Sequence, residues 1–234
     1  MLSPASRARS SWQQYLGLTP QALCFRPLRG LRASVSTPKL ENTIVALIGF
    51  AGTGKYTIGR ELSERTGAKL IDNHLINNPI FRVVNADGVT PLPPGIWDKV
   101  KSVRALVYEA IRELSPPDLS FVFTIELFES SPGDQRAFVD LERLAADRGS
   151  LFVPVRLLCD VEELSRRVVD PARVQMMKSI SAELARKKSA TEMVLNSNHP
   201  NILTIDVTQK SPGESSETIL AHLEKLMTVK REEN

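Results

Sequence analysis

A glycine-rich run, GFAGTGKYT, contains the residues of this chain whose spacing most clearly indicates chemistry. Gly49, Gly54 and Lys55 match the pattern GxxxxGK, and the run follows an apolar stretch and precedes a helical pattern, as that motif requires. Glycines let backbone N–H groups wrap a phosphate, and the following helix N-terminus adds a favourable field. The run therefore predicts a P-loop that binds a nucleoside triphosphate through Gly49, Gly52, Thr53, Gly54, Lys55, Tyr56 and Thr57, with Lys55 neutralising charge at the β- and γ-phosphates.

Tyr56 departs from the motif, because the residue after the lysine ordinarily offers a Ser or Thr hydroxyl to Mg²⁺. The phenol of a tyrosine lies several ångströms further out. Two interpretations follow: the metal is held through water and carboxylates, or catalysis is impaired. Mg²⁺ tolerates the first arrangement, because it keeps several waters and uses one or two carboxylates together with nucleotide phosphates. We favour the water-mediated site.

Short apolar strands alternate with amphipathic helices along the rest of the chain, which is typical of a parallel sheet with helices on both faces. The pattern predicts an α/β, three-layer P-loop NTPase fold with one five-stranded parallel sheet in a domain spanning residues 41–234. The expected strands are residues 43–48, 68–72, 120–125, 152–158 and 202–207. The expected helices are residues 55–66, 96–114, 134–148, 162–169 and about 216–229.

Charge and composition exclude several function classes. Residues 1–40 hold six basic side chains and no acidic one, so the remainder has 24 basic and 27 acidic residues, a net charge of −3. Such a body gives no electrostatic reason to expect nucleic-acid binding. No run approaches the roughly 20 apolar residues of a membrane-spanning helix, so no membrane partner is expected. Cys24 and Cys159 are isolated in sequence, which favours a reducing compartment, and we expect a cytoplasmic protein.

The first 40 residues are rich in Arg, Ser and Pro and lack apolar periodicity, so we expect a disordered basic leader. This composition is that of an organellar transit peptide, and an upstream extension from a misassigned start would look the same. A transit peptide would place the protein in the mitochondrial matrix or another organelle instead of the cytoplasm.

The stretch GFAGTGKYTIGRELSERTGAKLIDNH resembles the first strand, P-loop, helix and second strand of small-molecule kinases such as shikimate kinase and gluconate kinase. Nucleoside monophosphate kinases are more distant. Through the runs DNHLINNPIF, SPPDLSFVFT and HPNILTIDVT, most of residues 43–227 is also similar to poorly characterised bacterial P-loop proteins labelled AAA-family ATPases. The resemblance implies ATP and Mg²⁺ as cofactors and identifies no acceptor.

Asp72 stands where shikimate kinases place the first aspartate of their DxD motif, 17 positions after Lys55 (72 − 55). The resemblance implies a carboxylate beside the γ-phosphate that holds magnesium through water or accepts the proton of a substrate hydroxyl. A turn-capping aspartate is the alternative. His74, at the second aspartate's place, is a substrate-binding candidate or a solvated loop histidine. Asn73, Asn77 and Asn78 are weaker candidates for substrate contacts.

Glu126 follows the third expected strand and is a candidate for the carboxylate that orients magnesium-bound water. Thr124 and Glu129 compete with it, because successive strand residues face opposite sides and the sequence leaves the register open. Shikimate kinases carry a glycine cluster after this strand, whereas FTIELFESSPGD has no glycine before Gly133. Shikimate itself is therefore not an expected acceptor.

The segment CDVEELSRRVVDPARVQMMKSISAELARKK resembles the helix and lid of such kinases, with the lid at about residues 170–190. The resemblance puts Arg166, Arg167 and Arg173 where lid arginines close over phosphates, and Arg173, next to Pro171, is our choice among them. Charges on a solvated helix face are the alternative. The loop of residues 208–212 is expected beside the adenine.

Together these features predict an ATP-binding kinase that transfers the γ-phosphoryl group to a small-molecule acceptor. Lys55, Asp72 and Arg173 are the expected catalytic residues; Asp72 and His74 are expected to bind substrate, and Asp72 and Glu126 to hold the metal through water. The alternative is a regulatory module that binds or slowly hydrolyses nucleotide, and Tyr56 favours it. A GTPase is not expected, since the nearest string to an [NT]KxD guanine motif is TQKS.

Overall fold

Five parallel strands form the sheet of the computed structural model, which describes residues 40–232 apart from 85, 88–89 and 171–179. The expected leader thus lies outside the described residues except for Leu40, and so does Arg173. The strands run in the order β2-β3-β1-β4-β5, which brings the ends of strands distant in sequence to one edge. Their bounds are β1 (Thr43–Ile48), β2 (Lys69–Asp72), β3 (Phe121–Ile125), β4 (Leu151–Leu158) and β5 (Leu203–Asp206).

β1 lies at the centre of the sheet, and all six of its residues are buried. Ile44, Ala46 and Ile48 pack into the apolar layer on one face, while Val45 and Leu47 pack into the layer on the other. A strand covered on both faces needs apolar residues at every position, which explains the continuous run TIVALI. The predicted parallel sheet is confirmed, with each strand within one residue of its expected bounds.

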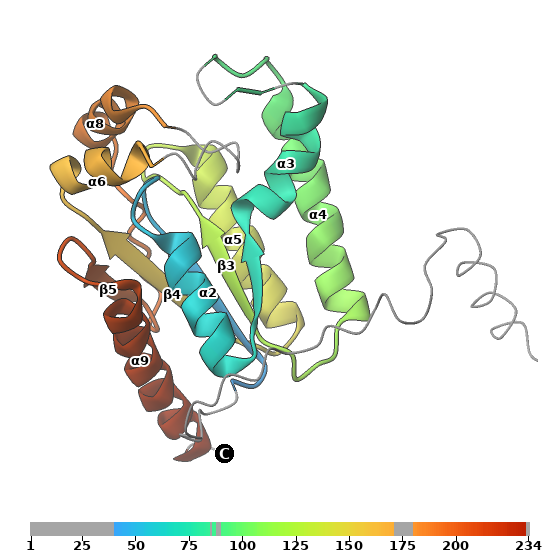
Figure 1. Ribbon diagram of the computed structural model, residues 1–234. Coiled ribbons are helices and arrows are strands. Elements are labelled where there is room, and N and C mark those ends of the chain that lie inside the picture. The colour runs from blue at the N-terminus through green and yellow to red at the C-terminus, as the bar shows by residue number, and fades with distance from the viewer. Residues whose placement is uncertain (1–39, 85, 88–89, 171–179, 233–234) are drawn as a thin grey trace, which may run out of the picture. The chain divides into compact units, whose positions relative to one another are not determined.

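Helices cover both faces of the sheet (Figure 1), so the predicted three-layer fold is also confirmed. On one face, α2 (Lys55–Thr66) and α9 (Pro212–Glu232) pack on the strands through side chains such as Ile58 and Leu223. On the other face, α4 (Ile96–Leu114) and α5 (Pro132–Asp147) do so through Ile111 and Leu141. No helix in the described residues is long and apolar enough to cross a bilayer.

Helix ends follow local signals, and α5 and α9 begin two or more residues before their expected starts. α2 ends at Gly67, whose φ of 78° lets its N–H donate to the Ser63 carbonyl at 2.9 Å. α5 begins two residues before the expected Asp134, because Ser131 is its N-cap and Pro132 occupies the first turn. α6 (Val161–Val168) begins after Asp160, whose side chain accepts hydrogen bonds from two first-turn N–H groups.

Two helices were not expected. α3 (Asn73–Val83) occupies a polar segment whose sequence resembles a loop. Burial of Ile76 and Phe81 against α4 stabilises this helix. This tertiary packing outweighs the internal Pro79. α8 (Ala182–Thr191) occupies the end of the expected lid, and the Ser181 side chain caps it. Both helices carry side chains that face the functional site described below.

Candidate functional site

The glycine-rich loop joins β1 to α2 at the carboxyl edge of the sheet. Its glycines stand where a side chain would clash with neighbouring atoms or where the backbone φ angle is positive. A Cβ at Gly49 would lie 2.9 Å from the Leu157 carbonyl oxygen and 3.0 Å from Thr53 Oγ1, so only glycine fits. Gly52 and Gly54 adopt φ values of 93° and 83°, which side-chain-bearing residues rarely adopt. The loop therefore forms a narrow backbone cradle in front of α2.

The side chains of the loop are held against its own backbone. The buried Thr53 hydroxyl donates to the Phe50 carbonyl at 2.9 Å, and the Thr57 hydroxyl donates to the Gly54 carbonyl at 2.8 Å. Lys55 Nζ donates to the carbonyls of Gly49 at 2.6 Å and Phe50 at 2.7 Å. An ammonium over the cradle and a helix N-terminus without acidic residues both favour a bound anion, so these residues fit a phosphate chain.

Glu126 lies directly against the loop. Its Oε1 accepts a hydrogen bond from the Ala51 N–H at 3.1 Å, and its Oε2 accepts one from Lys188 Nζ at 3.0 Å. Of the three candidates in and after β3, Glu126 is thus the one that bonds to the P-loop. Thr124 points to Asp72 instead, and the Glu129 N–H pairs with the Met193 carbonyl at 3.0 Å.

Lys188 is a site residue that the sequence analysis missed. It lies on α8, and its ammonium also stands 4.6 Å from the centroid of the Phe128 ring. The basic run from Arg186 to Lys188 was the available signal, but only folding of α8 brings one of these cations to Glu126. α8 and α6 contribute to a cavity of about 390 Å³ whose lining includes Phe50, Ala51, Glu126, Leu164, Val168 and Lys188.

Asp72 ends β2 and precedes α3 as its N-cap residue, yet its side chain makes no capping hydrogen bond. The carboxylate instead accepts a hydrogen bond from the Thr124 hydroxyl, which in turn accepts from the Asn73 N–H at 3.1 Å. The pairing of Asp72 with Thr124 across β2 and β3 creates this contact. The interpretation of Asp72 as a turn cap is therefore not supported, and its orientation is fixed by β3.

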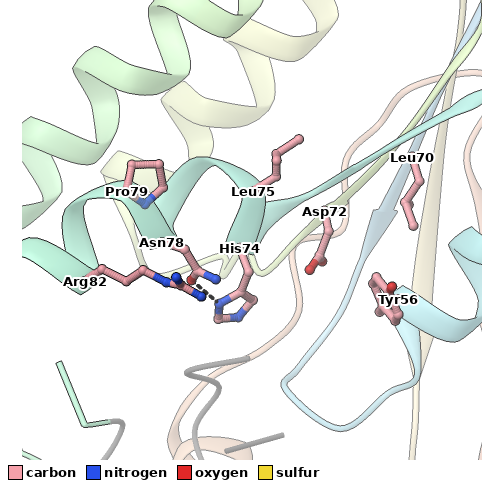
Figure 2. A pocket seen from close by; sticks show the side chains of 8 residues that line it. All are labelled: Tyr56, Leu70, Asp72, His74, Leu75, Asn78, Pro79 and Arg82. Atoms are coloured by element: carbon pink, nitrogen blue, oxygen red, sulfur yellow. Dashed lines mark hydrogen bonds between the residues drawn. The ribbon is translucent and has the colours of Figure 1, made fainter. Parts of the chain in front are cut away.

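A cavity of about 540 Å³ opens beside Asp72 (Figure 2). Tyr56 comes from α2, Asp72 from the end of β2, and the polar side chains at the far end from α3. The His74 ring Nδ1 lies 3.1 Å from Asn78 Oδ1. The lining residues are Tyr56, Leu70, Asp72, His74, Leu75, Asn78, Pro79 and Arg82.

The cavity separates the predicted substrate contacts into two groups. His74 and Asn78 line it, whereas Asn77 is buried in the helix packing and Asn73 is not among the lining residues. Arg82 lines it as well, and the sequence analysis missed it. The spacing of His74, Asn78 and Arg82 at four-residue intervals was the signal, because it places them on one face of a helix.

The two described lid arginines are bound to protein groups. Arg166 and Arg167 each contact Glu163 Oε1 at 2.6 Å, and these bonds lower the pKa of Glu163 to about 2. Arg167 also donates to the carbonyls of Val207 and Thr208, at 3.1 and 3.0 Å. It thus connects α6 to the loop expected beside the adenine. Arg173 lies outside the described residues.

The structure provides no dense metal cage. Within the described ranges, no three His, Cys, Asp or Glu side chains gather closely enough to hold an ion. Asp72 and Glu126 each reach this edge of the sheet as single carboxylates, Asp72 at the end of β2 and Glu126 directly after β3. Single carboxylates suit Mg²⁺, which keeps several waters and takes its remaining ligands from phosphates. The donor set therefore fits Mg²⁺ better than a metal that requires an all-protein cage.

Comparison with known proteins assigns a fold. No protein-family model matches the chain, and no curated protein matches it. Among solved structures, a gluconokinase from Sinorhizobium meliloti 1021 is similar, with a TM-score of 0.58 and 16% identity, covering 84% of this chain and 99% of its own. A candidate kinase from Chloroflexus aurantiacus has a TM-score of 0.55 and 15% identity, and the match covers 82% of this chain and 99% of that kinase. A sugar kinase from Janibacter sp. HTCC2649 has a TM-score of 0.51 and 17% identity, and the match covers 78% of this chain and 95% of that kinase.

At identities this low, the structural similarity shows the fold alone. The chain has the P-loop α/β fold found in small-molecule kinases, as its sequence predicted. The likeness to AAA-family ATPases stays a prediction.

Proposed function

We propose that this chain transfers the γ-phosphoryl group of ATP to a hydroxyl of a small molecule bound in the cavity beside Asp72. One observation carries the proposal: Tyr56, the residue directly after the P-loop lysine, lines the same cavity as Asp72. A phosphate cradle and a carboxylate thus adjoin one open pocket. Phosphoryl transfer requires this proximity, since its catalysis consists mainly of positioning and charge stabilisation.

Each group has a role in this proposal. The backbone N–H groups at the start of α2, which the P-loop leads into, bind the phosphates, and Lys55 Nζ exchanges its two loop carbonyls for β- and γ-phosphate oxygens. Asp72 orients the acceptor hydroxyl and accepts its proton as the new P–O bond forms. Thr124 is a positioning residue, because its hydroxyl fixes the carboxylate of Asp72.

A bound Mg²⁺ would supply positive charge that stabilises the transferred phosphoryl group. Asp72 and Glu126 are the residues proposed to hold it, both through water. Lys188 and the proposed Arg173 supply positive charge from the lid side, where Lys188 already lies 3.0 Å from Glu126. The loop of residues 208–212, whose Thr208 carbonyl accepts a hydrogen bond from Arg167, is the proposed contact for the adenine.

A regulatory nucleotide-binding module is the second candidate, and Tyr56 favours it. The ring lines the acceptor cavity at the position where the motif ordinarily provides a metal-binding hydroxyl. In addition, the Thr57 hydroxyl donates to the Gly54 carbonyl. A chain with this loop could bind ATP and transfer phosphate poorly.

Nucleotide binding is tested first. ATP with Mg²⁺ should raise the melting temperature of the full chain, and Lys55→Ala should abolish that rise. Lys101→Ala, on the exposed side of α4, is the matched control and should retain it. An equal rise in the Lys55→Ala variant would overturn the assignment of the triphosphate to this loop.

Transfer is tested next with a panel of hydroxylated acceptors, in which ADP release is compared with phosphorylated product. A kinase forms the two in equal amounts and loses this activity in Asp72→Asn. A regulatory module binds ATP and yields no phosphorylated acceptor. Tyr56→Thr separates the two further, since a large gain in Mg²⁺-dependent turnover would mean that the native loop is catalytically impaired.

A further inference from the structure

The position of Tyr56 gives the acceptor cavity two chemically different ends. Figure 2 shows the Tyr56 ring next to Leu70 at one end and His74, Asn78 and Arg82 at the other, with the Asp72 carboxylate between them. Tyr56 is half-buried, and its ring forms one wall of the cavity. An acceptor whose hydroxyl reaches Asp72 can therefore place neighbouring carbons against an aromatic and aliphatic surface.

An aromatic wall favours some acceptors over others. A ring-shaped polyol carries its C–H bonds on defined faces, and such a face packs closely on an aromatic ring with little loss of conformational freedom. An open-chain polyol presents alternating hydroxyl groups and loses rotamer freedom when it is held against a flat surface. A cavity of about 540 Å³ is large enough for either shape, so volume alone does not select between them.

We infer that Tyr56 is a specificity-determining residue that selects ring-shaped hydroxylated acceptors by packing against their C–H face. The inference rests on the proposed function and extends it to a substrate class. It also assigns a purpose to the departure from the P-loop motif: the side chain that replaces the metal-binding hydroxyl forms part of the acceptor site. The polar end, with His74, Asn78 and Arg82, receives the outward substituents of the ring.

The test compares ring-shaped probes, quinate and myo-inositol, with open-chain probes, gluconate and glycerate. For each probe, kcat/KM is measured by ADP release with ATP and Mg²⁺ in the full-length chain. The native protein should prefer the ring-shaped probes. Tyr56→Leu keeps an apolar side chain without an aromatic face and should lower the ratio of ring to open-chain kcat/KM by about tenfold. Tyr56→Phe, which retains the ring, should preserve the ratio.

The outcomes are distinct. An unchanged ratio in Tyr56→Leu, or a native preference for open-chain probes, would overturn the inference while leaving the kinase proposal intact. ATP binding without phosphorylation of any probe would overturn the kinase proposal, and this inference with it. If Tyr56→Leu does not fold, Tyr56→Thr provides the same comparison, because threonine is a residue type that the motif ordinarily carries.

Discussion

Adding a single methyl group at Gly49 should damage both the stability of the fold and its nucleotide site. In Gly49→Ala, the new Cβ would stand 2.9 Å from the Leu157 carbonyl oxygen, 3.0 Å from Thr53 Oγ1 and 3.3 Å from Leu157 Cβ. The first distance is shorter than real Cβ atoms show. Leu157 lies in the buried strand β4, and Thr53 is fully buried and bonded to Phe50, so neither neighbour moves easily.

Overpacking of this kind costs about 1–3 kcal/mol of the free energy of unfolding. For a body of this size, each kcal/mol lowers the melting temperature by about 2–4 °C. The expected fall is therefore about 2–12 °C. Any relief of the clash must shift the loop backbone, because the close contacts are a strand carbonyl and a buried side chain. The same change should therefore weaken ATP binding.

Urea denaturation and an ATP-dependent thermal shift measure the two effects. Gly133→Ala is the matched control: its Cβ would meet only Ser131 Oγ, at 3.7 Å, and Gly133 lies in the first turn of α5. Alanine there should leave stability unchanged or raise it by up to about 1 kcal/mol. A Gly49→Ala protein with native stability and native ATP response would refute the steric argument.

Three further perturbations test other parts of the site. Thr124→Val should lower the free energy of unfolding by about 1–3 kcal/mol, because it leaves the Asn73 N–H without its acceptor, and should lower kcat about 10- to 100-fold by releasing Asp72. Thr124→Ser should restore much of both the stability and kcat. Equal kcat in the native protein and both variants would contradict the positioning role of Thr124. Lys188→Gln should cost at most about 1 kcal/mol in urea denaturation, since the side chains of Lys188 and Glu126 are 45% and 27% exposed. Arg166 and Arg167 lower the pKa of Glu163 from 4.5 to about 2. The free energy of unfolding of the native protein should therefore fall as the pH drops from 4.5 to about 2, and Glu163→Gln should show a weaker dependence on pH.

The sequence was sufficient for features that depend on neighbouring residues. The spacing of glycines and lysine, placed between an apolar run and a helical pattern, predicted the loop from Gly49 to Thr57. The central strands were predicted for a related reason: β1 and β3 are buried at every position, so largely apolar runs such as TIVALI and FVFTI are readable without a structure. α3 was missed because its stability comes from packing against α4 and its polar residues resemble a loop.

The contents of the site depended on strand order and helix packing. Sequence periodicity left the strand register open, so Thr124 and Glu129 competed with Glu126 as candidates. The pairing of β3 with both β1 and β2 separates them, since it directs Thr124 to Asp72 and brings Glu126 to the Ala51 N–H, 75 positions away in sequence. Lys188 is a further 62 positions from Glu126 and reaches it only through α8.

The sequence by itself thus determined that this chain folds as a parallel α/β sheet with a glycine-rich loop between β1 and α2, because contiguous backbone geometry and burial set those features. Only the tertiary structure decided that Tyr56 faces the cavity of Asp72, that Arg82 joins that cavity, and that Lys188 meets Glu126. These contacts join elements whose order in the sheet differs from their order in the chain. The spacing of residues along the chain does not determine which strand ends become neighbours, and the site lies where those ends meet.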